Sequence, residues 1–162
     1  MRKKIKMFKY FWIALATIAL DQASKFAALH YLAGGPVEVL PVFNLALAYN
    51  TGAAFSFLRD AGGWQNLFFA GIATAVSVAI VFMIRRLGAK DTQLAVALWL
   101  ILGGALGNLF DRLYHGHVVD FIDVYYRAWH WPTFNVADSA IFIGALILIL
   151  DSVGWGFGKR RS

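Results

Sequence analysis

The sequence contains no cysteine and few charged residues. Without cysteine the chain can form no disulfide and no thiolate zinc site, and it has no thiol nucleophile. Only 15% of its 162 residues are charged, against 60% that are hydrophobic. This composition lies outside the usual soluble range and is typical of integral membrane proteins. The net charge of +6 is not spread as a basic face that could follow phosphates, so no nucleic-acid partner is expected. We expect one membrane-embedded domain over residues 1–162.

Four apolar stretches are long enough to cross a bilayer. A crossing helix needs about 20 residues, each rising roughly 1.5 Å. The predicted transmembrane helices are residues 11–32, 64–84, 92–112 and 135–155.

The basic residues gather at one end of these stretches. Eleven of the 15 lysines and arginines precede the first stretch, join the second to the third, or follow the fourth. By the positive-inside rule this end and both termini are cytoplasmic, and the loops at residues 33–62 and 114–133 are outside. The basic start also resembles a cleavable signal peptide. However, Ala14 and Ala16 lie within the apolar run and not after it, so we expect the first helix to stay attached.

The two outer loops have different patterns. Residues 37–49 alternate loosely between apolar and polar, and Pro36 and Pro41 confine any strand to a sheet edge, so a small extracytoplasmic β-sheet is predicted. In the second loop, Trp129 and Trp131 suit the headgroup zone of a bilayer. We expect this segment to be a surface-lying loop or helix. The predicted fold class is therefore an all-α integral membrane protein with four transmembrane helices and a small outer sheet.

Ionisable residues within the helices are the candidates for chemistry, because a charge at the bilayer centre costs about 2.5 to 3.5 kcal/mol. Asp21 and Lys25 stand four apart, the favourable order for an intrahelical ion pair. Asn108, Asp111 and Arg112 share one side of the third helix. Asp111 and Arg112 can form a bidentate pair, or each can pair elsewhere and brace a site.

A second group of acids lies toward the outer side. Asn135 and Asp138 begin the fourth helix, where they could simply form a helix cap. Asp120 lies in an apolar stretch on the same side, with Asp123 as its main competitor for a second carboxylate. Two carboxylates in a poorly hydrated pocket retain one proton between them, so the pair offers a base and an acid. Such a pair can activate water against a peptide carbonyl without a metal, a cofactor or a covalent intermediate.

Other interpretations of these polar residues remain open. His115 and His117 could bind a metal ion together with Asp120, although histidines in a glycine-containing turn are more often solvated. An ion- or proton-coupled transporter could use the intramembrane aspartates as a relay, and a scaffold protein could use them only as caps and ion pairs. Cleavage by the purified protein would separate a protease from both of these classes.

Five motifs, in order along the chain, resemble those of the lipoprotein signal peptidases (signal peptidase II). The motifs are Asp21, Gln22, Ser24 and Lys25, followed by residues 50–55, 103–112, 118–121 and 134–139. The resemblance implies a four-span aspartic endopeptidase of the bacterial inner membrane with its active site toward the outer leaflet. It also implies that Asp120 and Asp138 are the catalytic pair, with no metal or cofactor.

The same resemblance implies a substrate and the roles of the neighbouring residues. The substrate would be a prolipoprotein whose cysteine already carries diacylglycerol, cleaved on the N-terminal side of that cysteine within membrane lipid. The antibiotic globomycin would inhibit the enzyme. The implied supports of the catalytic pair or substrate are Asn50, Gly52, Asn108, Arg112 and Asn135, and the implied structural polar residues are Asp21, Lys25 and Asp111.

Overall fold

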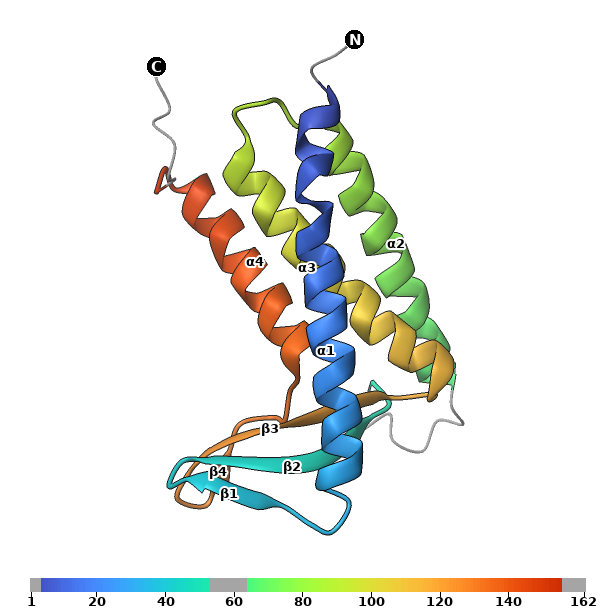
Figure 1. The fold of residues 1–162 in the computed structure, drawn as a ribbon, viewed down its shortest axis with the longest axis vertical. Coiled ribbons are helices and arrows are strands. Elements are labelled where there is room, and N and C mark those ends of the chain that lie inside the picture. The colour runs from blue at the N-terminus through green and yellow to red at the C-terminus, as the bar shows by residue number, and fades with distance from the viewer. Residues whose placement is uncertain (1–3, 53–63, 156–162) are drawn as a thin grey trace.

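A computed structural model describes residues 4–52 and 64–155, which form a helix bundle with a small sheet at one end (Figure 1). The last three residues of the second motif, 53–55, lie outside the described residues. The helices are η1 (Lys4–Tyr10), α1 (Phe11–Tyr31), α2 (Trp64–Arg86), α3 (Thr92–Tyr114) and α4 (Val136–Ser152). The strands are β1 (Val37–Leu40), β2 (Phe43–Asn50), β3 (Val118–Tyr126) and β4 (Trp129–His130). All four predicted helices are present, and α4 ends three residues earlier than predicted.

Two of the helices are long and apolar enough to cross a membrane. α2 and α3 have 23 residues each, which makes each about 35 Å long. Their most apolar windows differ in burial, with 22% buried in α2 and 50% in α3. The side chains that α2 leaves exposed include Phe68, Phe82 and Met83. A helix that is apolar and mostly unburied is suited to lipid.

α3 lies at the centre of the bundle, between α4 and α2 and behind α1 in Figure 1. Its glycines allow close approach of the neighbouring helices. A Cβ atom on Gly104 would collide with the carbonyl oxygen of Ala137 in α4, and one on Gly103 would lie 2.9 Å from the Cα atom of Ala14 in α1. Small residues are common where helices pack in a membrane, because the hydrophobic effect does not drive helices together in lipid and close contact must hold them.

The sheet is antiparallel in the order β1-β2-β3-β4 and lies at the end of the bundle opposite η1 (Figure 1). β1 and β2 confirm the small sheet predicted for residues 37–49. The prediction of a surface loop or helix for residues 114–133 is wrong, because this segment supplies β3 and β4. Residues 118–121 of β3 are all buried. A strand that is buried on both faces does not alternate between apolar and polar residues, so its sequence lacks the usual pattern that predicts a strand.

Candidate active site

Asp120 of β3 and Asp138 of α4 are joined by the side chain of Asn135. The Asn135 Nδ2 atom donates to Oδ1 of Asp120 at 2.7 Å, and its Oδ1 atom accepts from the backbone N–H of Asp138 at 2.9 Å. Asn135 is fully buried, and Asp120 is 2% exposed. One buried amide therefore contacts both the carboxylate of Asp120 and the backbone N–H of Asp138.

Local backbone structure brings the two acids to this point. Asn135 is the N-cap of α4, and the Asp138 side chain accepts from the Asn135 backbone N–H at 3.3 Å, which completes a capping box. The preceding residue, Phe134, exchanges backbone hydrogen bonds with Ile122 of β3 at 2.8 and 3.1 Å. This bridge holds the start of α4 against the strand that carries Asp120. The predicted helix cap is thus confirmed, and it is part of the same arrangement as the acid pair.

Three asparagines surround the two carboxylates and donate to them. Besides the contact from Asn135, Asn50 of β2 donates to Oδ2 of Asp120 at 3.1 Å, and Asn108 of α3 donates to Oδ1 of Asp138 at 2.7 Å. Since Asn135 also donates to Oδ1 of Asn108 at 3.2 Å, the three amides and two acids form one connected network.

The orientation of each asparagine amide follows from a group that can only donate. The three contacts to amide oxygens are Gly52 N–H to Asn50 at 2.8 Å, Lys25 Nζ to Asn108 at 2.9 Å, and Asp138 N–H to Asn135 at 2.9 Å. A backbone N–H or an ammonium group has no acceptor, so it must face the amide oxygen. Each NH₂ group is consequently turned toward a carboxylate.

Burial and charge favour a bound proton at this site. Burial, and then the charge of Asp138, raises the pKa of Asp120 from its ordinary value of 3.8 to about 6. The hydrogen bonds from Asn50 and Asn135 act in the opposite direction and offset part of this effect. The pair can therefore hold one proton near neutral pH, as expected for two acids in a poorly hydrated pocket.

A buried ionic cluster lies directly behind the acid pair. Lys25 of α1 is 2% exposed, and its Nζ atom lies 2.8 Å from carboxylate oxygens of both Asp21 and Asp111. The two acids also accept backbone N–H groups, Asp21 from Ala137 at 2.9 Å and Asp111 from Val119 at 3.1 Å. The predicted pair of Asp21 and Lys25 is confirmed. The cluster ties α1 and α3 to the starts of α4 and β3.

Arg112 and Asp111 do not form the bidentate pair that their side chains allow, since Asp111 pairs with Lys25. The guanidinium lies over the ring of Phe69 in α2, 5.3 Å from its centroid. Among the described residues, its buried Nη1 atom has no hydrogen-bond partner. A Cβ atom on Gly52 would collide with the same Phe69 ring, so Arg112, Phe69 and the turn after β2 meet beside the acid pair.

The competing residues contact groups other than the two acids. Asp123 accepts from Nδ2 of Asn44 at 3.3 Å and contacts Nδ1 of His130 at 2.8 Å. The rings of His115 and His117 lie with their centroids 5.8 Å apart. Within residues 4–52 and 64–155, no three His, Asp or Glu side chains are grouped to hold a metal ion. The geometry thus favours Asp120 over Asp123 as the partner of Asp138.

The sequence placed Gln22 in the first motif without giving it a role, and it did not identify Phe69. Gln22 donates to Oδ1 of Asp111 at 2.9 Å and to the carbonyl oxygen of Gly107 at 3.3 Å. A polar residue one turn before Lys25 in an apolar helix is a signal that could have indicated this role. Phe69 lies among many similar residues of α2, and no sequence signal distinguishes it.

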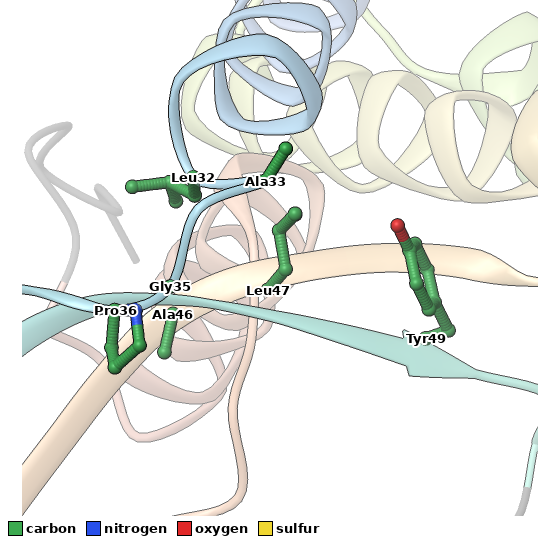
Figure 2. A pocket seen from close by; sticks show the side chains of 7 residues that line it. All are labelled: Leu32, Ala33, Gly35, Pro36, Ala46, Leu47 and Tyr49. Carbon is green, nitrogen blue, oxygen red and sulfur yellow. The ribbon is translucent and has the colours of Figure 1, made fainter.

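A pocket of about 360 Å³ lies between the end of α1 and strand β2 (Figure 2). Its lining residues are Leu32, Ala33, Gly35, Pro36, Ala46, Leu47 and Tyr49. None of these described lining residues carries a carboxylate. Tyr49 pairs with Val119 in the register of the sheet, one position away from Asp120, and adjacent positions in a strand present side chains to opposite faces.

Comparison with known proteins gives consistent matches over most of the chain. The sequence profile of the family described as signal peptidase (SPase) II matches residues 13–154. The lipoprotein signal peptidase of Polynucleobacter necessarius subsp. necessarius is 48% identical over 158 residues, which are 97% of this chain and 96% of the relative. That of Pseudomonas fluorescens is 52% identical over 149 residues, covering 88% of this chain and 85% of the relative.

Solved structures show the same fold. A bacterial membrane enzyme determined by the in meso method at 2.3 Å resolution has a TM-score of 0.82 and 31% identity, covering 100% of this chain and 98% of its own. A second bacterial membrane enzyme, at 1.9 Å resolution, has a TM-score of 0.80 and 32% identity, with 94% and 97% covered.

Proposed function

The chain belongs to the signal peptidase II family, and we propose that it removes signal peptides from prolipoproteins as an aspartic endopeptidase in which Asp120 and Asp138 are the catalytic pair. The observation that carries this proposal is the contact of one buried side chain, Asn135, with the carboxylate of Asp120 and with the backbone N–H of Asp138. The pKa of about 6 for Asp120 supports it, since a pair that holds one proton near neutral pH offers an acid and a base together.

The first half of the proposed reaction forms a tetrahedral intermediate. Asp120 begins protonated and Asp138 ionised, because Asp138 lies in the first turn of α4, where the helix dipole favours an anion. Asp138 takes a proton from a water molecule as the water oxygen bonds to the scissile carbonyl carbon. Asp120 passes its proton to the carbonyl oxygen, which gives a geminal diol.

The second half breaks the peptide bond. One hydroxyl of the diol returns a proton to Asp120 as the carbonyl re-forms and the C–N bond breaks. Asp138 gives its proton to the departing amine. The products are the signal peptide with a new carboxyl group and the lipoprotein with a free N-terminus, and both acids return to their starting states. Asn50, Asn108 and Asn135 hold the carboxylates in position throughout, because their NH₂ groups are fixed toward them.

The substrate we propose is a precursor whose cysteine carries diacylglycerol, cut on the N-terminal side of that cysteine. A signal helix and two acyl chains already reside in lipid, so a site at the end of the bundle needs no extraction step. Arg112 has a buried N–H group without a described partner, and it supports substrate binding as a donor to a peptide carbonyl. Globomycin is the proposed inhibitor.

We further propose that α1 to α4 all span the bacterial inner membrane, with residues 1–162 forming one domain. The side chains of Lys9, Arg85, Arg86 and Lys90 are exposed at the end opposite the sheet, which supports cytoplasmic termini. α4 has 17 residues, or about 26 Å, a span that a thinned bilayer or slight insertion of the sheet would match. The acid pair then faces the outer leaflet.

The test is cleavage by purified protein in detergent. A diacylglyceryl-modified precursor should be cut before the modified cysteine, the unmodified precursor should be cut far more slowly, and globomycin should stop the reaction. Mass spectrometry of both fragments fixes the cleaved bond. Added hydroxylamine should yield no hydroxamate, because direct attack by water forms no acyl-enzyme. Cleavage at another bond, or a hydroxamate product, would refute the proposal.

A further inference from the structure

Lys25 contacts the machinery around the acid pair as well as its two ionic partners. Its ammonium group makes three contacts, to Asp21 at 2.8 Å, to Asp111 at 2.8 Å and to Oδ1 of Asn108 at 2.9 Å. An ammonium group has three protons to donate, so all three are used. Two contacts would suffice for a structural ion cluster. The third is directed at a residue that touches Asp138.

The third contact determines which way the Asn108 amide faces. Asn108 lies between Lys25 and Asp138, and its two ends differ in chemistry. With Lys25 in place, the amide oxygen must face the ammonium group, and Nδ2 is left to donate to Asp138 at 2.7 Å. Without Lys25, the remaining donor to the oxygen is Asn135, whose contact is longer at 3.2 Å. A rotated amide would present oxygen to the carboxylate and repel it.

We propose that Lys25 is a positioning residue of the catalytic pair, acting through Asn108 to keep a hydrogen-bond donor on Asp138. The inference rests on the proposed function, because it takes Asp120 and Asp138 as the catalytic groups. It assigns Lys25 a role beyond the structural ion pair that the sequence indicates. The role belongs to the lysine in particular, since neither Asp21 nor Asp111 could donate to Asn108.

The charge of Lys25 adds a second, separable effect. The pKa of Asp120 is raised by burial and by Asp138, whereas Lys25 acts in the opposite direction. Besides Lys25, the charged groups that act on the pair are Asp21 from α1 and Arg112 from α3, and Asp111 from α3 lies against Lys25 itself. Removal of the one lysine therefore makes the surroundings of the pair more negative.

The test compares two variants of the same cluster by their pH–rate profiles on the lipidated precursor. Lys25→Met should lower kcat by about 10- to 100-fold with KM nearly unchanged, since a lost support misplaces a catalytic group. The ascending limb of the pH–rate profile of Lys25→Met should move to higher pH by up to about 1 unit, because the variant lacks a cation near the acid pair. Asp111→Asn removes an ion pair but leaves Lys25 on Asn108. It should retain more of kcat, and its ascending limb should move to lower pH.

A charge-balanced variant covers the case in which Lys25→Met does not fold. Asp21→Asn with Lys25→Met removes one charge of each sign, and the Asn oxygen can still accept from Ala137. This double variant should fold, and its kcat should be as low as that of Lys25→Met. The ascending limb of its pH–rate profile should shift less than that of Lys25→Met. The positioning role would be overturned if Lys25→Met and Asp111→Asn lost kcat equally and in proportion to the fraction of unfolded protein, and if their pH–rate profiles did not shift. Full activity of Asp138→Asn would instead overturn the proposed function.

Discussion

Asp120 takes up a proton more readily in the folded protein than in the unfolded chain. Burial and Asp138 raise its pKa from 3.8 to about 6. A carboxyl group whose pKa is raised on folding contributes stability that is fully present below its unfolded pKa. That contribution is lost as the pH rises from about 4 through 6. Above pH 6 the folded protein holds a carboxylate in an unfavourable place, at a cost of up to about 3 kcal/mol, since one pKa unit equals about 1.4 kcal/mol.

Replacement of Asp120 by asparagine should therefore stabilise the protein while it abolishes cleavage. At pH 8, Asp120→Asn should unfold at a higher temperature than the unaltered chain, and the difference should shrink toward pH 4. Thermal unfolding in detergent across this range is the measurement. Asp123→Asn is the control, because Asp123 lies on the same strand but contacts Asn44 and His130. A lower unfolding temperature for Asp120→Asn at pH 8 would contradict the assignment of an unfavourable anion.

The backbone conformation of Gly52 and the ring beside it leave no room for a side chain at this position. Its φ of +99° lies in the left-handed region, and an added Cβ atom would meet the Phe69 ring. Because its N–H orients Asn50, Gly52→Ala should reduce cleavage sharply. The matched control is Gly35→Ala, which carries a similar strain at φ +129° but whose Cβ would meet nothing within 4 Å in the described part of the chain. Equal cleavage rates for the two variants would show that the turn does not support the site.

The pair of Asp21 and Lys25 could be predicted from the sequence, because it depends on local spacing and on the cost of charge in an apolar segment. For the partner of Asp138 the residues alone left Asp120 and Asp123 open, and the choice of Asp120 came from the family resemblance. The partners of Asp111 and Asn108 could not be predicted. Both lie on α3, and their contacts with Lys25 join residues 83 or more positions apart. Such contacts depend on the rotation of α3 against α1, which glycine contacts set and hydropathy does not reveal.

The glycines of α3 set how closely the neighbouring helices pack against it. Gly104 lies against the Ala137 carbonyl group, one residue before Asp138. Gly104→Ala should push α4 away, destabilise the fold by about 1 to 3 kcal/mol and reduce activity. Gly71→Ala on α2 is the matched control, because an added Cβ would meet nothing within 4 Å among the residues described. It should leave activity intact. Full activity of Gly104→Ala would contradict close packing of α3 on α4.

The helices were predictable and β3 was not, for one physical reason. A long apolar run of about 20 residues has few alternatives to a helix in lipid. The first four residues of β3 are buried on both faces of the strand, and β3 pairs with β2, so that Asn50 reaches Asp120 across 70 positions of chain. Neither a period of two nor a local turn marks that pairing in the sequence.

The proposed orientation of the whole molecule can be tested cleanly because the chain has no cysteine. Ala128 is exposed at the sheet end, and Lys90 is exposed at the opposite end. In intact cells stripped of their outer membrane, a membrane-impermeant maleimide should label Ala128→Cys at once. It should label Lys90→Cys only after the membrane is opened. The reverse pattern, or equal labelling, would contradict the assignment of the sheet to the outer side.

The central claim is that Asp120 and Asp138 act together on the scissile peptide bond. The most direct measurement is the rate of cleavage of a lipidated precursor by purified Asp120→Asn, Asp138→Asn and Asp123→Asn, each shown to be folded by thermal unfolding. The account predicts that the first two lose at least about 10²- to 10⁴-fold in rate, while Asp123→Asn keeps most of its activity. Substantial turnover by either of the first two variants, or its loss in Asp123→Asn alone, would contradict the account.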